Sequence, residues 1–246
     1  MNADYAEFNN SRLAQIYDAF CPLGKDSDFF LSEVKKSNPK SVLDVGCGSG
    51  ILTVELTKIA DIVVGVEPAV PMLEIARRRP GGNKVTWIQG HVTDVSDMTV
   101  DVIIMSSHVA QFLLDEDEWQ LTLEHLSTLL SPGGKLIFDS KNPLVKPWSS
   151  WNKENTKRSV DTALGNVMMW NELLSVVDNR VQYQLHYMLE SGDILTSNNE
   201  LIYRTKENLS NSLIRAGFEV EAIIGDWDGS FANNSSEEMI FVARKS

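Results

Sequence analysis

Three glycines and two carboxylates stand at spacings that suit the binding of a nucleoside. Gly46, Gly48 and Gly50 directly follow the apolar run SVLDV, and Asp44 lies two residues before the first of them. Glycine loops at strand ends usually hold phosphate, but a carboxylate at Asp44 disfavours a phosphate and favours an ammonium or another cation. Glu67, at the end of the next predicted strand, is placed to accept hydrogen bonds from two ribose hydroxyls. The pattern predicts a nucleoside with a positively charged tail.

Two other nucleotide-binding loops fit this stretch poorly. A dinucleotide fingerprint needs G-x-G-x-x-G, but Ile51 stands where the third glycine belongs. A P-loop needs Gly-Lys followed by Ser or Thr, and the loop contains no lysine. A NAD-dependent oxidoreductase therefore remains only as an alternative. The ligand that combines a nucleoside, a cationic tail and no phosphate is S-adenosyl-L-methionine.

The elements that must position these residues belong to an α/β fold. Near-continuous apolar runs such as Val102–Met105 are typical of strands that are covered on both faces, as in a parallel sheet. Their alternation with helical patterns predicts a doubly wound, mostly parallel sheet, whose ligands bind at the carboxyl ends of the strands. We expect strands at 41–45, 61–67, 84–90, 101–107 and 134–140, and helices at 51–60, 71–79 and 117–130.

The second half of the chain has a different pattern. From Trp148 to about Tyr203 it is rich in β-branched and aromatic residues, with hairpin signals at 178–179 and 191–193. This predicts an inserted antiparallel meander of about three strands. We expect one domain, 1–246, made of an N-terminal helical lid (1–40), a cofactor-binding core (41–143), the β insertion (144–205), and a final helix and β-hairpin of the core sheet (206–246).

The stretches SVLDVGCGSG, GVEP, QGHVTD, DVIIMSS and LSPGGKLIFDSKNP resemble the class I, Rossmann-like S-adenosylmethionine-dependent methyltransferases. The resemblance covers roughly 17–142, together with the final helix and strand pair. It implies a seven-stranded sheet whose last strand is antiparallel. It also implies a set of cofactor-binding residues: Tyr17, Asp44, Gly46, Cys47 and Gly48 at the methionine end, Glu67 and Pro68 at the ribose, Ser106 beside the sulfonium, and Met72, His91, Val92 and Asp94 toward the adenine. Met72 has core packing as its alternative role, and the adenine contact is open between Asp94 and a backbone group.

Methyl transfer from a sulfonium is an in-line displacement, so the protein must mainly hold the acceptor close to the methyl group and aligned with it. A base is needed only if the acceptor must lose a proton. His108, Tyr17 and Glu172 are the candidates, and His108 and Tyr17 are the expected catalytic residues. The two cysteines, Cys21 and Cys47, have no zinc-binding spacing, and we expect no metal.

Charge and motifs narrow the acceptor to a small molecule. A formal net charge of -12 repels polyphosphate backbones, so no nucleic acid is expected. SSHVAQ follows the fourth strand in place of the Asn/Asp-Pro-Pro-Tyr/Phe motif of enzymes that methylate nucleobase or glutamine amines. We expect an N or O acceptor under aromatic residues of the insertion: Trp148, Trp151, Trp170, Tyr183 and Tyr187. Acidic groups in GDWDGSF, 225–231, suit an amine.

Several alternatives stay open at this point. The aromatic residues of the insertion could instead form a homodimer interface, so the protein is expected to be a monomer or a homodimer. A non-catalytic, methyltransferase-like protein that binds the nucleoside or a protein partner is the alternative function. The arginines at 77–79 fit the C-terminal end of a helix better than an anion site. No apolar stretch is long enough to span a membrane and the start has no signal-peptide pattern, so we expect a cytoplasmic protein.

Overall fold

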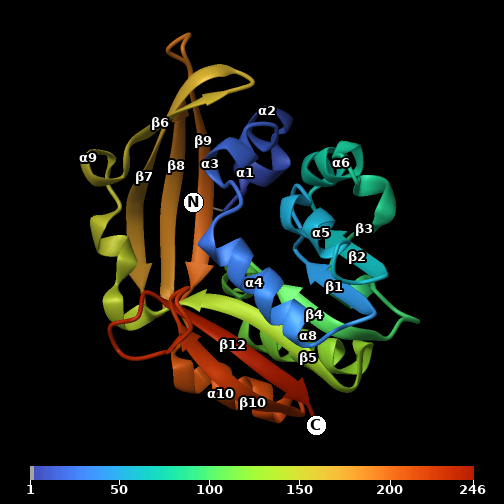
Figure 1. Ribbon diagram of the computed structural model, residues 1–246. Helices are drawn as coiled ribbons and strands as arrows, with labels where there is room; N and C mark the ends of the chain where they lie inside the picture. The colour runs from blue at the N-terminus through green and yellow to red at the C-terminus, as the bar shows by residue number, and fades with distance from the viewer. Residues whose placement is uncertain (1–2) are drawn as a thin grey trace.

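The computed structural model describes residues 3–246 and contains two β-sheets (Figure 1). Residues 1 and 2 of the expected lid lie outside this range. The larger sheet has eight strands in the order β11-β10-β12-β5-β4-β1-β2-β3. These strands are β1 (Ser41–Val45), β2 (Ile62–Glu67), β3 (Thr86–Gln89), β4 (Val100–Met105), β5 (Leu130–Lys141), β10 (Phe218–Gly225), β11 (Ser230–Phe231) and β12 (Glu238–Lys245).

The predicted doubly wound sheet with an inserted antiparallel sheet is confirmed. Strands β1 to β5 pair in parallel, and β12 runs antiparallel to both β5 and β10. The count of seven was one short, because the two-residue strand β11 adds to the edge at β10. A strand of two residues is too short to show the alternating apolar pattern from which strands are predicted.

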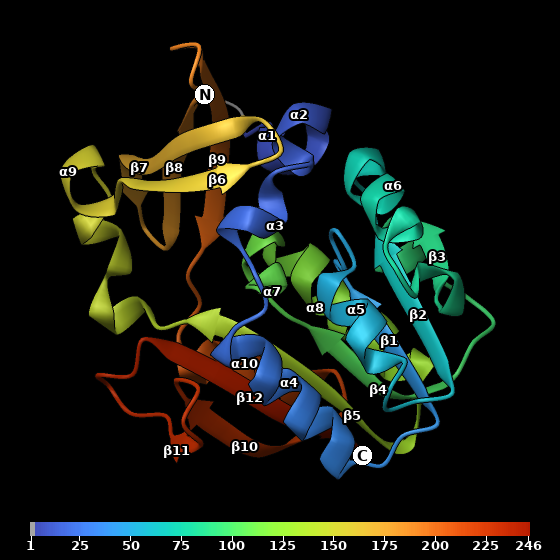
Figure 2. The same ribbon diagram turned by 45° about the horizontal axis from the view of Figure 1, so that its top comes forward.

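Helices cover both faces of the larger sheet (Figure 2). On one face, α8 (Glu116–Leu129) and α10 (Lys206–Arg215) bury Leu123 and Leu213 in the largest core cluster. On the other, α4 (Lys25–Lys36) and α5 (Ile51–Leu56) bury Phe30 and Leu56. The sheet is therefore sandwiched, as its continuous apolar strands require. The remaining helices beside it are α6 (Val70–Arg78) and the short α7 (Val109–Phe112).

The insertion forms a separate four-stranded antiparallel sheet in the order β6-β7-β8-β9. Its strands are β6 (Arg158–Thr162), β7 (Gly165–Val177), β8 (Arg180–Met188) and β9 (Ile194–Ile202), and α9 (Lys153–Thr156) precedes them. Both hairpin signals fall between strands as expected. The expected number of about three strands missed β6, whose sequence RSVDT has only one apolar residue.

Three short N-terminal helices connect the two sheets: α1 (Ala6–Asn9), α2 (Ser11–Ala14) and α3 (Tyr17–Phe20). Helices α1 and α2 contact α6, and α1 also contacts β9 (Figure 2). Asp4 accepts a hydrogen bond from the Asn198 side chain at 2.7 Å, and Glu7 bonds the Ser197 hydroxyl. In contrast to α1–α3, the fourth helix of the expected lid segment, α4, packs into the sheet core.

None of the helices within residues 3–246 combines the length and the apolar character needed to cross a membrane.

Gly65, in the middle of β2, makes room for the Trp87 ring on β3. A Cβ at this position would lie 2.7 Å from Trp87 Cζ3 and 2.9 Å from Cys47 Sγ. We expect Gly65→Ala to lower the free energy of unfolding by about 1–3 kcal/mol, the usual cost of overpacking a core. Urea denaturation measures this change.

The control is the same substitution in a Trp87→Leu background, where the cost of Gly65→Ala should shrink because the clashing ring is gone. An equal cost in both backgrounds would contradict a steric role for Trp87.

Candidate active site

The glycine loop after β1 has a backbone conformation that glycine adopts readily. Gly46, Gly48 and Gly50 have φ values of 69°, 54° and 73°. A Cβ on Gly46 would lie 2.6 Å from Val109 of α7, whereas a Cβ on Gly48 would meet nothing within 4 Å. Gly46 is therefore required by packing, and the space beside Gly48 is open for a ligand.

The carboxylate of Asp44 lies beside this loop, and only one of its two oxygens is hydrogen-bonded to a group within residues 3–246. Its side chain is 1% exposed and accepts a hydrogen bond from Thr53 Oγ1 at 2.6 Å through Oδ2, while Oδ1 has no partner within residues 3–246. Burial raises the pKa of Asp44 to about 7, although the Thr53 bond partly offsets this. A buried, unpaired carboxylate oxygen is suited to a cationic ligand group.

Glu67, at the end of β2, connects the glycine loop to the start of α6. Its carboxylate accepts hydrogen bonds from the backbone N–H of Gly48 at 3.0 Å and of Ala69 at 2.8 Å. Burial raises the pKa of Glu67 above its usual value. Since a carboxylate can accept about four hydrogen bonds, the group retains capacity for two hydroxyls of a ligand.

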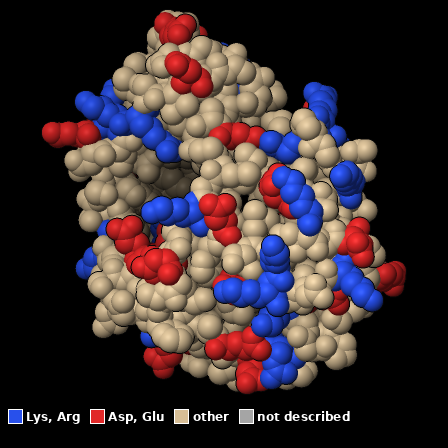
Figure 3. Space-filling model, in the orientation of Figure 1, with Lys and Arg blue, Asp and Glu red and all other residues tan. Residues whose placement is uncertain are grey.

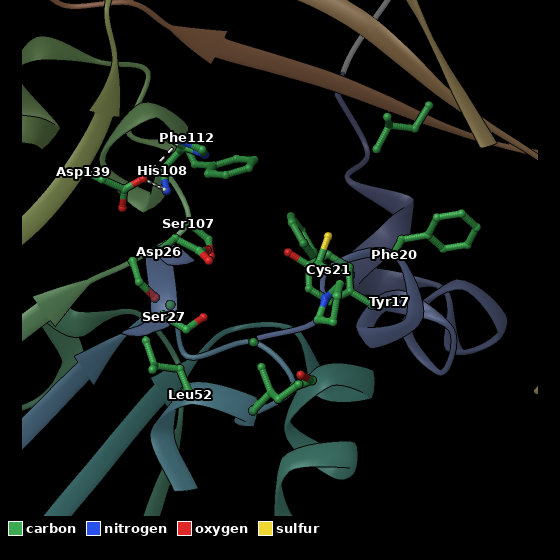
Figure 4. A pocket seen from close by; sticks show the side chains of 18 of the residues that line it. Tyr17, Phe20, Cys21, Asp26, Ser27, Leu52, Ser107, His108, Phe112 and Asp139 are labelled. Atoms are coloured by element: carbon green, nitrogen blue, oxygen red, sulfur yellow. Dashed lines mark hydrogen bonds and ion pairs between the residues drawn. The ribbon is translucent and has the colours of Figure 1, made fainter. Parts of the chain in front are cut away.

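A cavity of about 480 Å³ opens over the glycine loop and extends beneath the β insertion. Figure 3 shows this face of the molecule hollowed over the β6–β9 sheet. In Figure 4, His108 and Asp139 lie on one side of the cavity and Tyr17 and Cys21 on the other. The lining residues that bear on function are Tyr17, Phe20, Asp44, Gly46, Cys47, Gly48, Ser106, His108, Phe112, Asp139, Lys141, Trp151, Arg158, Tyr183, Tyr187 and Trp227.

A charged cluster forms the wall of the cavity beyond the end of β4. His108 Nε2 lies 2.9 Å from Glu238 Oε2 and 3.1 Å from Asp139 Oδ2. Lys141 Nζ lies 2.7 Å from the other oxygen of Glu238. Ser107 and His108 both have positive φ, 58° and 65°, a strained conformation that is common where side chains must be held for function.

The two carboxylates of this cluster have opposite pKa shifts. Burial raises the pKa of Asp139 to about 6. Burial also works to raise the pKa of Glu238, but the hydrogen bonds and positive charges of His108 and Lys141 outweigh it and lower the pKa to about 2. Glu238 is therefore ionised at neutral pH.

The structure brings part of the predicted site together in this cavity. Seven of the predicted cofactor-binding and catalytic residues line it: Tyr17, Asp44, Gly46, Cys47, Gly48, Ser106 and His108. Burial raises the pKa of Tyr17 well above its usual value, so its phenol stays protonated at neutral pH and cannot take a proton. This favours His108 over Tyr17 as the proton acceptor.

The other predicted residues lie around or outside the cavity. Met72 is fully buried and packs with Ala14 and Ala69, as its alternative role in core packing requires. Pro68 is exposed directly after Glu67. His91, Val92 and Asp94 lie at a 3-10 turn, Val92–Asp94, where the Asp94 carboxylate accepts the His91 backbone N–H at 2.9 Å. None of these three lines the cavity.

The insertion and the 225–231 segment contribute fewer residues than expected. Trp151, Tyr183 and Tyr187 line the cavity, but Trp148 packs on Tyr203 and Trp170 stacks on His186. Glu172 pairs with His186 and does not line the cavity. Trp227 does line it, whereas the carboxylates of Asp226 and Asp228 bond nearby backbone N–H groups.

Sequence reasoning missed Asp139, Lys141 and Glu238. Asp139 and Lys141 end β5, and Glu238 begins β12. Glu238 could have been found from the antiparallel direction of the last strand, because this direction brings the first residue of β12 to the edge where the parallel strands end. Arg158 was missed together with β6.

Arg79, the last of the three arginines, does more than end α6. Its Nε donates to the Ser49 carbonyl at 3.0 Å, and its Nη2 pairs with Asp18 of α3. Ser49 also donates from its hydroxyl to Asp18. This group fastens the N-terminal helices to the glycine loop.

Comparison with known proteins agrees with this geometry. Residues 42–134 match the methyltransferase domain family. The chain therefore contains a methyltransferase domain, and it shares the fold of S-adenosylmethionine-dependent methyltransferases. It is 25% identical over 219 residues to the cypemycin N-terminal methyltransferase of a Streptomyces species, covering 88% of this chain and 87% of the relative.

Solved structures share the fold. A methyltransferase from Clostridium acetobutylicum ATCC 824 has a TM-score of 0.79 at 17% identity, over 96% of this chain and 98% of that one. The amino pentose methyltransferase of calicheamicin biosynthesis from Micromonospora echinaspora, solved with its cofactor bound, has a TM-score of 0.70 at 21% identity, over 94% and 97%.

The cofactor of this methyltransferase is S-adenosylmethionine, and the glycine loop offers a fitting site. We propose that the unpaired oxygen of Asp44 accepts the cofactor's ammonium group, that the open space beside Gly48 holds its methionine part, and that Glu67 bonds its ribose hydroxyls.

Asp44 should make cofactor binding depend on pH. With a pKa of about 7, the Asp44 carboxylate is mostly ionised at pH 8 and mostly protonated at pH 6. Only the ionised form can pair with the ammonium group, so affinity for S-adenosylhomocysteine should fall about tenfold from pH 8 to pH 6. Calorimetric titration at the two pH values measures this.

Asp44→Asn is the control, and it should bind weakly at both pH values. A tenfold pH dependence that persists in Asp44→Asn would assign the titration to another group.

Proposed function

We propose that this methyltransferase transfers the methyl group to the amine nitrogen of a small, largely apolar molecule. The observation that carries the proposal is the single cavity that runs from the glycine loop to the aromatic inner face of the insertion. A volume of about 480 Å³ lies within the usual range for small-molecule sites, and the methionine end of the cofactor takes part of it.

The inner face of the insertion suits an apolar acceptor. Tyr183 packs against Trp151 with ring centroids 4.6 Å apart, and Tyr187 against Phe20 at 5.7 Å. Phe112, at the end of α7, lines the same space. These rings exclude water and hold a flat or compact molecule against the cofactor end, which supplies much of the rate of an in-line displacement.

The wall at the end of β4 suits an amine. Asp139 and Glu238 lie beside His108 and favour a group that becomes positively charged during the reaction. The names of two similar proteins also point to amine acceptors, since one is an N-terminal methyltransferase and another an amino pentose methyltransferase.

S-adenosylmethionine, when bound, supplies a methyl group activated by its sulfonium. Held by Asp44 and Glu67, the cofactor would donate this methyl group to the amine lone pair, and its carbon–sulfur bond would break. The amine must be neutral to attack, and the methylated nitrogen then carries a positive charge, which it loses with a proton if the product leaves as a neutral amine. His108 is the side chain placed to take that proton, because it lines the cavity and Tyr17 remains protonated.

Matched acceptor pairs test the proposal. The protein is incubated with S-adenosylmethionine and a series of primary arylalkyl amines, each paired with the alcohol of the same skeleton. Release of S-adenosylhomocysteine and the mass of the product are measured. We expect turnover of amines at least tenfold above that of their alcohols.

The Asp44→Asn variant is the control, and it should show no turnover of either member of a pair. Methylation of the alcohols in preference to the amines would contradict the proposal. Wild-type protein that binds S-adenosylhomocysteine but methylates no acceptor in the series would favour a non-catalytic, nucleoside-binding protein instead.

A further inference from the structure

We propose that Asp139 and Glu238 are positioning residues that keep the neutral His108 ring protonated on Nε2, so that Nδ1 is the atom that takes the proton from the acceptor. The catalytic use of Nδ1 rests on the proposed function. The state of the ring does not, because it follows from the contacts of His108 alone.

The contacts of Nε2 decide where the proton lies. The distances from Nε2 to Glu238 Oε2, 2.9 Å, and to Asp139 Oδ2, 3.1 Å, are both hydrogen-bond distances. An ionised carboxylate can only accept a hydrogen bond. Because the Lys141 ammonium lies 2.7 Å from the other oxygen of Glu238 and favours its ionised form, Nε2 must donate to it.

The ring is also fixed in orientation. Asp139 Oδ2 accepts a hydrogen bond from the backbone N–H of His108 at 3.1 Å and also lies 3.1 Å from its Nε2. One carboxylate therefore holds both the backbone and the ring of His108. A flip of the imidazole would place a carbon where Nε2 now meets the two oxygens. The left-handed backbone at Ser107 and His108 holds the residue at the start of α7.

The surrounding charges favour a ring that can gain a proton. Lys141 neutralises part of the charge of Glu238, and Tyr203, beside Glu238, is kept protonated by burial. The remaining negative charge of Asp139 and Glu238 stabilises an imidazolium between them. His108 is therefore suited to gain a proton during the reaction and to lose it afterwards.

Nδ1 is the nitrogen left for this exchange. It makes no hydrogen bond to any group within residues 3–246, and His108 lines the cavity. In the proposed step, an N–H bond of the methylated ammonium breaks, its electron pair stays on the acceptor nitrogen, and the proton bonds to the Nδ1 lone pair. The neutral ring becomes an imidazolium and the product leaves as a neutral amine.

The same three side chains could instead hold a metal ion, since their ligand atoms lie within 4.8 Å of one another. The ammonium group of Lys141 on Glu238 opposes a second cation there. The test therefore includes metal binding as an outcome that would overturn the proposal.

The first test uses NMR of the full chain with ring-¹⁵N-labelled histidine and needs no acceptor. The chain has only four histidines, so His108→Gln identifies the His108 signals by their loss. At pH 7.5 we expect the tautomer with hydrogen on Nε2 and a bare Nδ1. A ring protonated on Nδ1, a full imidazolium at this pH, or displacement of the ring proton by one equivalent of Zn²⁺ or Mn²⁺ would each overturn the proposal.

The second test follows the two positioning residues. In Glu238→Gln and Asp139→Asn one negative charge is lost, so the imidazolium is less stable and the ring should gain its second proton at lower pH in the NMR titration. Glu237→Gln, one position earlier and exposed, is the matched control and should leave the titration unchanged. A merely structural role would lower stability in the first two variants without moving the His108 titration.

The pH profile of kcat/KM with an accepted amine tests whether His108 takes the proton, independently of the tautomer of its ring. The acidic limb should move to lower pH in Glu238→Gln by the same amount as the NMR titration. If the NMR result holds but the acidic limb stays in place, His108 is positioned as proposed but is not the proton acceptor. If no amine is methylated, the proposed function fails while the ring assignment stands.

Discussion

The backbone turn at the end of β1 is the constraint on which the site depends. Positions 46 and 50 of this turn must be glycine, because a Cβ on Gly46 would lie 2.6 Å from Val109 and a Cβ on Gly50 would lie 2.6 Å from the Trp87 ring. The Gly46 and Cys47 N–H groups bond the Val66 carbonyl at 2.9 and 3.1 Å. The turn is thereby fixed against β2, and at Gly48 it leaves open space beside the cavity.

Other parts of the site follow from this turn. Glu67 bonds the Gly48 N–H and so sets the distance between the loop and α6. The close approach of Gly46 to α7 places the start of that helix, and with it His108, on the far side of the cavity. The glycine loop thus positions both the cofactor end of the site, through Glu67, and the acceptor end, through α7. Methyl transfer needs the two ends to be held in a fixed relation to each other.

Closure of the cavity depends on the N-terminal helices. Asp18 on α3 pairs with Arg79 near the glycine loop, and Glu7 on α1 bonds Ser197 in the insertion. One short segment thus fastens the cofactor region to the β6–β9 sheet. Apolar packing also holds this segment, because Leu13, Ile16 and Phe20 are buried in one cluster with residues of the insertion.

The sequence predicted best what local spacing determines. The glycines, Asp44 and Glu67 could be found because a turn after a strand and an acid after the next strand leave a fixed spacing. Strands such as β4 could be found from their apolar runs. In the same way, the two hairpin signals located the ends of β7 and β8.

The features that were missed depend on contacts between distant segments. Glu238 meets His108 only because β12 runs antiparallel beside β5, across 130 positions of the chain. Strand β6 lacks an apolar period and is held by pairing with β7. The engagement of Asp226 with backbone N–H groups is likewise a consequence of packing.

Hydrogen exchange of the wild-type protein with and without saturating S-adenosylhomocysteine tests the central claim most directly. The account predicts slower amide exchange in the glycine loop 44–50, around 67–69 and in the N-terminal helices at 13–20, with α10 and β10 unchanged. Protection confined to the insertion, or no change in the glycine loop of a folded protein that binds the ligand, would contradict it.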